Sequence, residues 1–356
     1  MRKILFVGGG SVGHIAPAVA VWEELKKRMP DASAHFVVST RPDDAGFLLT
    51  TGLPFTTFDA PRLSCAFPYA FWKSCRAAAK IIERERPALV FSKGGYVSVP
   101  FCFVAHRKGI PIVLHESDVV GGYANRIVGR WAKTVCQGFQ TRKTNDANHI
   151  FTGNPVRAGI NKGSRDEGLR ITGLSGKKPI LLVMGGSQGA QAINDAIVAQ
   201  LPDLLLRCDI IHITGRGKNH TNHGSPITDH YYATEFATST LPHLYACSDI
   251  ALSRAGAGSI AELAANRIPT ILVPLRGVGH DHQQKNAEEA ELLRGCMVLQ
   301  QNLLSSQLLT ALHSLVSDEP LRRRMSENFA AMWVPDAACL IAKCIAECLA
   351  RSPRAE

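Results

Sequence analysis

The sequence predicts an α/β protein of two domains, each built around a mostly parallel β-sheet. The chain has 356 residues, which is more than one domain usually holds. Short apolar runs alternate with stretches of helical periodicity, the pattern of βαβ units. One such unit, an apolar run followed by a glycine turn and an amphipathic helix, occurs near the start of the chain and again near residue 180. We therefore predict two Rossmann-like domains that face a cleft.

The first domain is predicted to span residues 1–157. It opens with the apolar run KILFVGGG, whose glycine ending is typical of a buried parallel strand. Apolar residues then recur at helical spacing in HIAPAVAVWEELKKRMP, and the helix stops at Pro30. HFVVST predicts a second strand. Further strands are expected at 87–92 and 110–116, with a helical stretch over 69–86.

The second domain is predicted over residues 179–334, where the pattern restarts. PILLVMGGSQGAQAINDAIVAQL again reads as strand, glycine turn and helix, and CDIIHIT follows as a strand. Residues 158–178 are polar, rich in glycine and without periodicity, so a linker is expected there. Pro335 opens the last helical run, and we expect residues 335–356 to form a helix that packs back on the first domain. Ligands of such sheets bind beyond the carboxyl ends of the strands.

Positive charge is concentrated in the first domain. Residues 1–160 hold 21 Lys and Arg against 11 Asp and Glu, whereas the remainder holds 19 of each kind. An excess confined to one half favours an anionic partner there, and nucleic acid, an anionic membrane surface and a phosphorylated substrate all fit.

The chain carries no sign of export or of membrane insertion. The apolar run after Met1 is too short for a signal-peptide core, and no later run approaches the roughly 18 residues of a membrane span. Ten cysteines in such a chain predict free thiols. A cytoplasmic protein is expected.

The stretch GGGSVGH at residues 8–14 raises two alternatives. Its first six letters match the dinucleotide fingerprint G-x-G-x-x-G, which needs an acid about 20 residues on for the ribose of a nicotinamide cofactor. The second strand ends at Arg41 with no acid before Asp43, although Arg41 could meet an NADP phosphate. The other alternative, which we favour, is a glycine turn that presents His14 at the start of a helix.

Seven stretches together resemble the MurG family, the membrane-associated transferases that add N-acetylglucosamine to a lipid-linked muramyl peptide. The likeness runs almost end to end and keeps the order and spacing of the family. It implies the B-type glycosyltransferase fold, in agreement with the internal repeat. The stretches are GGSVGHIAPAVAV, SKGGYVSVP, HESDVVGGYANR, GNPVR, GGSQGAQAIN, SRAGAGSIAEL and DHQQKNA.

The donor site is expected in the second domain. In SRAGAGSIAEL, small residues precede a helix, so backbone N–H groups at its N-terminus can face a diphosphate. The resemblance implies that Glu262 binds the ribose of a UDP-sugar, that two amides lie near the sugar, and that TEFATS reads uracil. The expected donor residues are Gly185, Gly186, Ser187, Gln188, Phe236, Ala237, Gly256, Ala257, Gly258, Ser259, Glu262, Gln283, Gln284 and Asn286.

The acceptor site is expected in the first domain. His14 at a helix start can act as a general base toward an acceptor hydroxyl, because the helix N-terminus favours the neutral imidazole. The resemblance implies that the neighbouring loops bind the lipid diphosphate. The expected acceptor residues are Gly10, Ser11, Gly13, Gly94, Gly95, Tyr96, Glu116, Asp118, Asn125 and Arg157.

The sequence departs from the family pattern at two places in the first domain and, with less consequence, at Ala255 in the second, where serine is common. The family usually shows G-G-T-G-G-H, whereas this chain has Ser11 and Val12 in that turn. The family usually shows H-E-Q-N, whereas this chain has Ser117 and Asp118 after His115-Glu116. Asp118 puts a negative charge where the family has a neutral amide, which bears on the identity of the acceptor.

A membrane-contact surface is expected near residue 70. Aromatic residues stand among basic ones there, which suits an interface with anionic lipid. The position matches the membrane-facing patch of the family, so peripheral attachment to the cytoplasmic face of the cell membrane is expected. The predicted contacts are Phe67, Tyr69, Phe71, Trp72 and Lys73.

The favoured hypothesis is an inverting transferase that moves N-acetylglucosamine from UDP to the lipid-linked muramyl peptide in peptidoglycan synthesis. Its expected partners are UDP-N-acetylglucosamine, the undecaprenyl-diphosphate-linked muramyl peptide, an anionic membrane surface and other cell-wall synthesis proteins, with no nucleic acid. The sequence has no D-x-D acid pair, so neither a metal ion nor a cofactor is expected. Two alternatives stay open: a UDP-sugar transferase with another lipid acceptor, and a weakly catalytic scaffold at the membrane.

Overall fold

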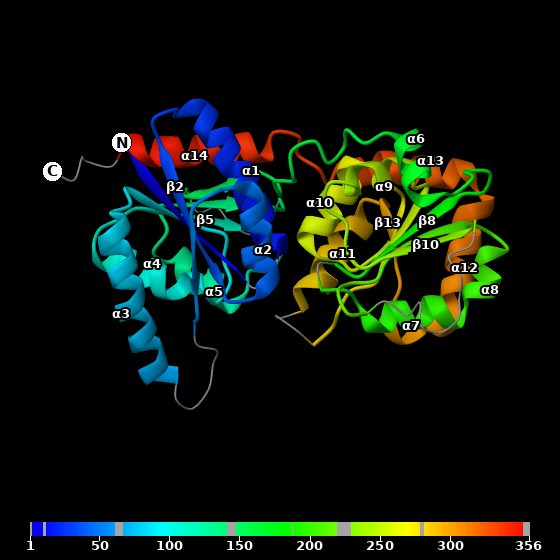
Figure 1. The fold of residues 1–356 in the computed structure, drawn as a ribbon, viewed down its shortest axis with the longest axis horizontal. Helices are drawn as coiled ribbons and strands as arrows, with labels where there is room; N and C mark the ends of the chain where they lie inside the picture. The colour runs from blue at the N-terminus through cyan, green and yellow to red at the C-terminus, as the bar shows by residue number, and fades with distance from the viewer. Residues whose placement is uncertain are drawn as a thin grey trace. The chain divides into compact units, whose positions relative to one another are not determined.

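The computed structural model describes residues 2–9, 12–60, 67–140, 147–186, 188–218, 229–277 and 281–351. The chain divides into two compact units, Met1–Arg157 together with Val334–Glu356, and Ala158–Trp333. Each unit has its own parallel sheet covered by helices (Figure 1).

The described residues of the first unit form a seven-stranded parallel sheet with the order β3-β2-β1-β4-β5-β6-β7. The order reverses its direction between β1 and β4. Phe6 of β1 pairs in register with Phe36 of β2 on one side and with Phe91 of β4 on the other. The strands are β1 (Lys3–Val7), β2 (Ser33–Ser39), β3 (Phe55–Phe58), β4 (Leu89–Ser92), β5 (Ile112–Glu116), β6 (Thr134–Gln137) and β7 (His149–Phe151).

Alternate side chains of these strands enter cores on the two faces of the sheet. Phe6 belongs to the core that contains α1 and α14, and Leu5 belongs to the core that contains α3 and α4. The C-terminal helix α14 therefore packs on the first unit, beside α1 (Figure 1). The helices are α1 (Val12–Arg28), α2 (Pro42–Thr51), α3 (Phe67–Glu85), α4 (Ser98–Arg107), α5 (Tyr123–Gly129) and α14 (Ala337–Arg351).

The described residues of the second unit form a six-stranded parallel sheet with the order β10-β9-β8-β11-β12-β13, which reverses between β8 and β11. The strands are β8 (Ile180–Met184), β9 (Asp209–Ile213), β10 (Tyr231–Thr234), β11 (Ile250–Ser253), β12 (Thr270–Leu272) and β13 (Cys296–Val298). The helices are α6 (Arg165–Thr172), α7 (Gln191–Ala199), α8 (Leu201–Leu205), α9 (Leu241–Cys247), α10 (Ala257–Ala265), α11 (His282–Leu292), α12 (Leu304–Ser317) and α13 (Glu319–Ala330), with the 3₁₀ turn η3 (Gln301–Leu303).

The predicted linker at 158–178 is instead part of the second unit and contains the helix α6. Ser164 caps this helix by accepting a hydrogen bond from the Glu167 amide. A Cβ at Gly163 would lie 1.9 Å from the Pro242 carbonyl oxygen, and one at Gly168 would lie 2.3 Å from that of His243. The glycines that suggested flexibility therefore allow α6 to pack closely on α9.

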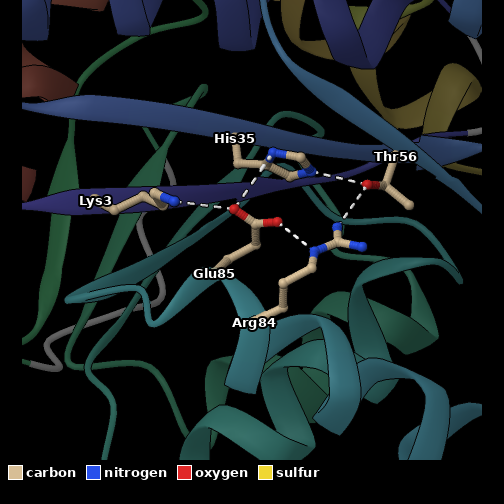
Figure 2. A network of polar contacts seen from close by, with 5 residues as sticks. All are labelled: Lys3, His35, Thr56, Arg84 and Glu85. Atoms are coloured by element: carbon tan, nitrogen blue, oxygen red, sulfur yellow. Dashed lines mark hydrogen bonds and ion pairs between the residues drawn. The ribbon is translucent and has the colours of Figure 1, made fainter.

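A polar network lies at the amino ends of the first three strands and ties α3 to the sheet (Figure 2). Glu85 at the end of α3 accepts a hydrogen bond from Lys3 Nζ at 3.0 Å and lies 3.6 Å from His35 Nδ1. Thr56 Oγ1 contacts His35 Nε2 at 2.8 Å and accepts from Arg84 at 3.2 Å. Burial lowers the pKa of His35, although the Glu85 carboxylate opposes this shift.

We predict that α14 contributes strongly to the stability of the first unit. Ile345 is fully buried in the core shared with α1. Ile345→Ala removes three carbons from that core and should lower the free energy of unfolding by about 3 kcal/mol. Urea denaturation followed by circular dichroism measures the change. Lys343→Ala on the exposed face of the same helix is the control, with an expected effect below about 0.5 kcal/mol. Equal losses in the two variants would contradict the packing role of α14.

Candidate functional site

The two loops that follow β1 and β4 meet at the switch point of the first sheet. A Cβ at Gly95 would lie 2.8 Å from the Gly9 carbonyl oxygen, and a Cβ at Gly9 would lie 2.6 Å from the Ser39 amide nitrogen. Gly94 and Gly95 also have positive φ angles of 87° and 81°. Only glycine allows this approach of the two backbones. The other predicted residues of the first loop, Gly10 and Ser11, and the side chain of Val12 lie outside the described residues.

His14 lies in the first turn of α1, directly after this loop, and Gly13 beside it is exposed. Its half-buried imidazole lines a small pocket together with Gly8 and Lys93. The pocket is at the carboxyl ends of the strands, where parallel α/β sheets bind their ligands.

Lys93 is a residue of this pocket that sequence reasoning missed. Its side chain is only 3% exposed, and its Nζ lies 2.7 Å from His115 Nδ1 and contacts Ser117 Oγ. Burial lowers the pKa of Lys93 to about 8, against the opposing charges of Glu116 and Asp118. The signal that could have identified it is a lysine at the end of an apolar run that is buried on both faces.

Glu116 is held on both sides by its own loop. Asn125 Nδ2 donates to Glu116 Oε2 at 2.7 Å, and the Asp118 amide donates to Oε1 at 2.9 Å. A Cβ at Gly121 would lie 2.7 Å from Oε2, so the loop fits closely around the carboxylate. Burial raises the pKa of Glu116, and the negative charge of Asp118 adds to this effect.

Asn125 presents an acceptor to this part of the site. Its Oδ1 is buried and has no hydrogen-bond donor among the residues that the structure describes. Since Nδ2 is committed to Glu116, Oδ1 is a buried acceptor that no donor of the described residues satisfies. A Cβ at Gly94 would lie 2.4 Å from this oxygen, so glycine at 94 is needed to leave it room.

The segment GNPVR supports the same loop. Asn154 is buried, and its Nδ2 donates to the Ser117 carbonyl oxygen at 2.9 Å. Arg157, the predicted acceptor residue of this segment, is half-buried, and the first stretch of the first unit ends there. Tyr96 is also half-buried and packs against the core formed with α3 and α4.

The glycine loop after β8 occupies the equivalent switch point of the second unit. A Cβ at Gly185 would lie 2.1 Å from the Ala190 amide nitrogen, and a Cβ at Gly189 would lie 2.3 Å from the Thr214 carbonyl oxygen. Gly186 has a φ angle of 79°. Gln188 is exposed, and its carbonyl oxygen accepts from Lys218 Nζ at 2.8 Å. Ser187 lies outside the described residues.

A buried polar network supports this loop from below. Asn194 Nδ2 donates to the Thr214 carbonyl oxygen at 2.9 Å, while Asn194 Oδ1 lies 3.0 Å from His212 Nε2. His212 Nδ1 in turn lies 2.9 Å from the Tyr231 hydroxyl. Asn194 stands at the end of the quoted GGSQGAQAIN stretch and was not identified from sequence.

The N-terminus of α10 follows β11 at the same switch point. Gly256 is the N-cap residue with an extended backbone, and no side chain of the described residues caps the first turn. A Cβ at Gly258 would meet no atom within 4 Å, so packing within the protein does not require glycine there. Ala257 is buried and Ser259 half-buried. Backbone amides at such a terminus suit a phosphate group.

Glu262 lies one turn further along α10, in a half-buried position. Its Oε2 accepts a hydrogen bond of 2.9 Å from the hydroxyl of Tyr245 on α9, which is almost fully buried. This contact fixes one carboxylate oxygen toward the protein. Tyr245 is a supporting residue that could not be found from the sequence, because it contacts Glu262 only in the folded unit.

The predicted amides of α11 support neighbouring loops. Asn286 is fully buried, and its Nδ2 donates to the Ala255 carbonyl oxygen at 3.2 Å, just before α10. Gln283 Oε1 accepts from the Leu275 amide at 3.0 Å, and Gln284 Oε1 accepts from Arg276 at 3.2 Å. Asn286 thus supports the segment that precedes α10, and its predicted place beside a sugar stays a prediction.

The predicted uracil segment follows β10 at the same end of the sheet. Phe236 is half-buried and Ala237 is buried. The exposed Arg216, on the loop after β9, places its guanidinium 5.1 Å from the centre of the Phe236 ring. Thr234 Oγ1 donates to the Phe236 carbonyl oxygen at 3.2 Å, which fixes the turn.

The start of α3 carries an exposed aromatic surface. Tyr69 is 70% exposed and Trp72 is 54% exposed, with the Arg76 guanidinium 4.7 Å from the Trp72 ring centre. Lys73 is also exposed. Phe71 instead packs inward against Phe103. The side chain of Phe67 lies outside the described residues.

Neither a metal cluster nor a membrane-spanning helix occurs in the described part of the chain. Its His, Cys, Asp and Glu residues form no group of three that could hold a metal ion. None of its helices is both long and apolar enough to cross a bilayer.

Comparisons with known proteins place these features in a family context. The glycosyltransferase family 28 N-terminal domain matches residues 4–137, and the glycosyltransferase family 28 C-terminal domain matches residues 180–341. A relative from Lachnoclostridium phytofermentans is 33% identical over 322 residues, which cover 87% of this chain and 89% of the relative. A relative from Geobacillus thermodenitrificans is 34% identical over 339 residues, which cover 92% and 94%. Both are named UDP-N-acetylglucosamine--N-acetylmuramyl-(pentapeptide) pyrophosphoryl-undecaprenol N-acetylglucosamine transferase.

Solved structures share the fold. The crystal structure of MurG from Acinetobacter baumannii matches with a TM-score of 0.75 at 21% identity, covering 98% of this chain and 100% of that one. The structure of MnaA from S. aureus with UDP matches with a TM-score of 0.73 at 16% identity, covering 99% of each chain. The predicted B-type glycosyltransferase fold is thereby confirmed.

We predict that Glu262 contributes to nucleotide binding through its carboxylate. Glu262→Gln keeps the volume and the hydrogen bond from Tyr245 but removes the charge, so UDP affinity should fall by about tenfold. Isothermal titration calorimetry with UDP measures it. Glu319→Gln, exposed at the start of α13 and paired with Arg323, is the control and should leave the affinity unchanged. Unchanged affinity in the Glu262 variant would rule out this role.

Proposed function

The chain belongs to glycosyltransferase family 28 and, within it, to the MurG family, and on this premise we propose that it transfers N-acetylglucosamine from UDP-N-acetylglucosamine to a hydroxyl of an undecaprenyl-diphosphate-linked muramyl peptide. The observation that carries the donor half of this proposal is the N-terminus of α10. Its first turn has no side-chain cap among the described residues, and Glu262 follows one turn later. A nucleoside diphosphate needs these two features, an anion site and an acceptor for ribose hydroxyls.

The acceptor half of the proposal rests on the first unit. Its switch point combines a glycine loop, a helix N-terminus and the buried Lys93, which together suit an anion. The buried Oδ1 of Asn125, which has no donor among the described residues, suits a hydroxyl or amide donor of the same ligand. The positive charge of residues 1–160 favours an acceptor that carries a diphosphate.

His14 is the proposed general base. It removes the proton from the acceptor hydroxyl, whose oxygen then attacks the anomeric carbon of the donor sugar. The bond between that carbon and the UDP oxygen breaks, and its electron pair leaves with the diphosphate. The amides of α10 stabilise the charge that develops on the leaving group. One displacement at this carbon inverts its configuration.

Asp118 supports a second candidate, a UDP-sugar transferase that uses another lipid acceptor. Its backbone is fixed by Glu116, so its position in the acceptor loop is well defined. The negative charge it adds distinguishes this loop from one that ends in a neutral amide. A weakly catalytic scaffold remains the third candidate.

Peripheral attachment to an anionic membrane surface is part of the proposal, and the exposed face at the start of α3 supports it. The exposed Tyr69 and Trp72 have apolar rings, and Lys73 and Arg76 supply positive charge beside them. Aromatic and basic side chains in one patch suit the interfacial region of a bilayer.

Release of UDP from UDP-N-acetylglucosamine, measured with and without the lipid-linked muramyl peptide in detergent, tests the function. We expect release to depend on that lipid. Release with a different polyprenyl-diphosphate sugar, and none with the muramyl peptide, would favour the second candidate. No release with any acceptor would leave the scaffold.

The role of His14 is tested in the same assay. His14→Ala should lower kcat by at least about 100-fold, because general-base assistance is lost. UDP affinity should not change, since the proposed nucleotide site lies on the second unit. His106→Ala, on α4 and stacked on Trp131, is the matched control. A variant that loses UDP affinity but keeps kcat would overturn the assignment of the base.

The membrane surface is tested by co-sedimentation with phosphatidylglycerol vesicles. The Tyr69→Ser, Trp72→Ser double variant should bind about tenfold more weakly, because two exposed rings no longer enter the interface. Leu206→Ser is the control, since Leu206 is 77% exposed on the second unit. High salt should weaken binding of the unmodified protein. Equal binding of the double variant and the unmodified protein would exclude this surface.

A further inference from the structure

Lys93 is a buried cation whose two hydrogen-bond partners among the described residues are His115 and Ser117. Lys93 directly follows β4 in the chain. Its side chain packs beside Gly8, since a Cβ at Gly8 would lie 3.0 Å from Lys93 Cβ. The proposed acceptor site uses the positive charge of Lys93, but the packing of the side chain does not explain why a charged residue stands here.

Both partners of Lys93 are neutral. His115 Nε2 lies 3.1 Å from the carbonyl oxygen of Gly153, which can only accept, so the ring proton is on Nε2. His115 Nδ1 is then an acceptor for Lys93. Burial, with the nearby Lys93 charge, lowers the pKa of His115 well below its usual value. The hydrogen bonds of Lys93 therefore leave its positive charge uncompensated.

The negative charges that act most strongly on Lys93 are those of Glu116 and Asp118. Both favour the charged form of Lys93, against the burial that lowers its pKa to about 8. Among the described residues, the hydrogen bonds of Lys93 Nζ go to His115 and Ser117 and not to either carboxylate. Both acids therefore act on the lysine electrostatically, through space. At neutral pH the lysine is mostly charged.

The two acids cannot move away from this lysine without breaking contacts. Glu116 is fixed by Asn125 and by the Asp118 amide, and Asn154 holds the Ser117 carbonyl oxygen. A diphosphate that reaches the proposed acceptor site would meet the Glu116 carboxylate held in place and the aspartate two residues further on, whose backbone is fixed. Repulsion between these like charges would weaken binding unless a cation offsets it.

A merely structural role does not account for the charge. An ammonium loses its hydration on burial, whereas methionine could fill a similar volume without this cost. Hydrogen bonds to two neutral groups replace only part of the lost hydration. The charge is thus the property that the site retains.

We propose that Lys93 is a positioning residue that offsets the charges of Glu116 and Asp118, so that the acceptor loop can bind a ligand which is itself a diphosphate. The inference deepens the proposed function and rests on it. The charge of Asp118, which distinguishes this loop, is then one of the two charges that the lysine offsets.

A double-mutant cycle on the full chain tests the proposal. The variants are Lys93→Met, Asp118→Asn and their combination, assayed by UDP release with the undecaprenyl-diphosphate-linked muramyl peptide. Lys93→Met should raise the KM for this lipid by about tenfold, and leave the KM for UDP-N-acetylglucosamine unchanged. In the Asp118→Asn background, the fold-increase in lipid KM caused by Lys93→Met should be smaller by a factor of about three or more.

The pH profile is a second readout that a purely structural lysine would not change. Lys93 loses its proton above about pH 8, so the lipid KM of the unmodified protein should rise there and that of Lys93→Met should not. The groups that face Lys93 are His115, Glu116 and Asp118 at the end of β5, and Cys136 on β6. His14 lines the same pocket from α1 and is common to both proteins.

Lys3→Met is the matched control. It removes a lysine paired with Glu85 at the opposite end of the same sheet, and should leave the lipid KM unchanged (Figure 2). Thermal unfolding of each variant shows that the first unit is folded. An unchanged lipid KM in Lys93→Met, or an equal loss with and without Asp118, would overturn the proposal while the function stands. No lipid-dependent UDP release by the unmodified protein would instead reject the proposed function, and this inference with it.

Discussion

The reversal of strand order in each parallel sheet is the constraint on which both halves of the candidate site depend. Where the order reverses, the loops after two adjacent strands leave in opposite directions and a space opens at their carboxyl ends. In the first unit these loops follow β1 and β4, and in the second they follow β8 and β11. Backbones approach so closely there that glycine is required, as at Gly95 in the first unit and Gly185 in the second.

Buried polar contacts then hold these loops in one conformation. Lys93 with His115 does so in the first unit, and Tyr245 with Glu262 does so in the second. Asn286 contributes in the same way through Ala255. Burying such polar groups costs free energy unless they are hydrogen-bonded. Moving a neighbouring loop would break these hydrogen bonds, so the buried contacts hold the loops in place. The carboxylates and amides proposed to bind ligands are thereby held in position within each unit.

The loop after β5, which holds the proposed acceptor residues Glu116 and Asp118, shows how a departure in sequence is accommodated in structure. Asp118 looks unfavourable beside a diphosphate when it is considered alone. In the folded unit its charge acts on Lys93, a residue 25 positions earlier that reaches the same loop from another strand. The two positions are linked by the pairing of β4 with β5. A change at either one therefore alters the electrostatics of the whole loop.

The sequence by itself determined the fold class, the two glycine turns and the identity of His14 and Glu262 as candidates. The fold class and the turns follow from local rules: apolar periodicity sets strands and helices, and glycine marks places where backbones come close. The candidate roles of His14 and Glu262 came from the resemblance to the MurG family. Only the tertiary structure decided that Lys93 is buried on His115, that Asn286 supports Ala255, and that residues 158–178 belong to the second unit. These depend on pairs of residues far apart in the chain. Their energies come from burial and long-range hydrogen bonds, and a local pattern carries no information about which distant group will be the partner.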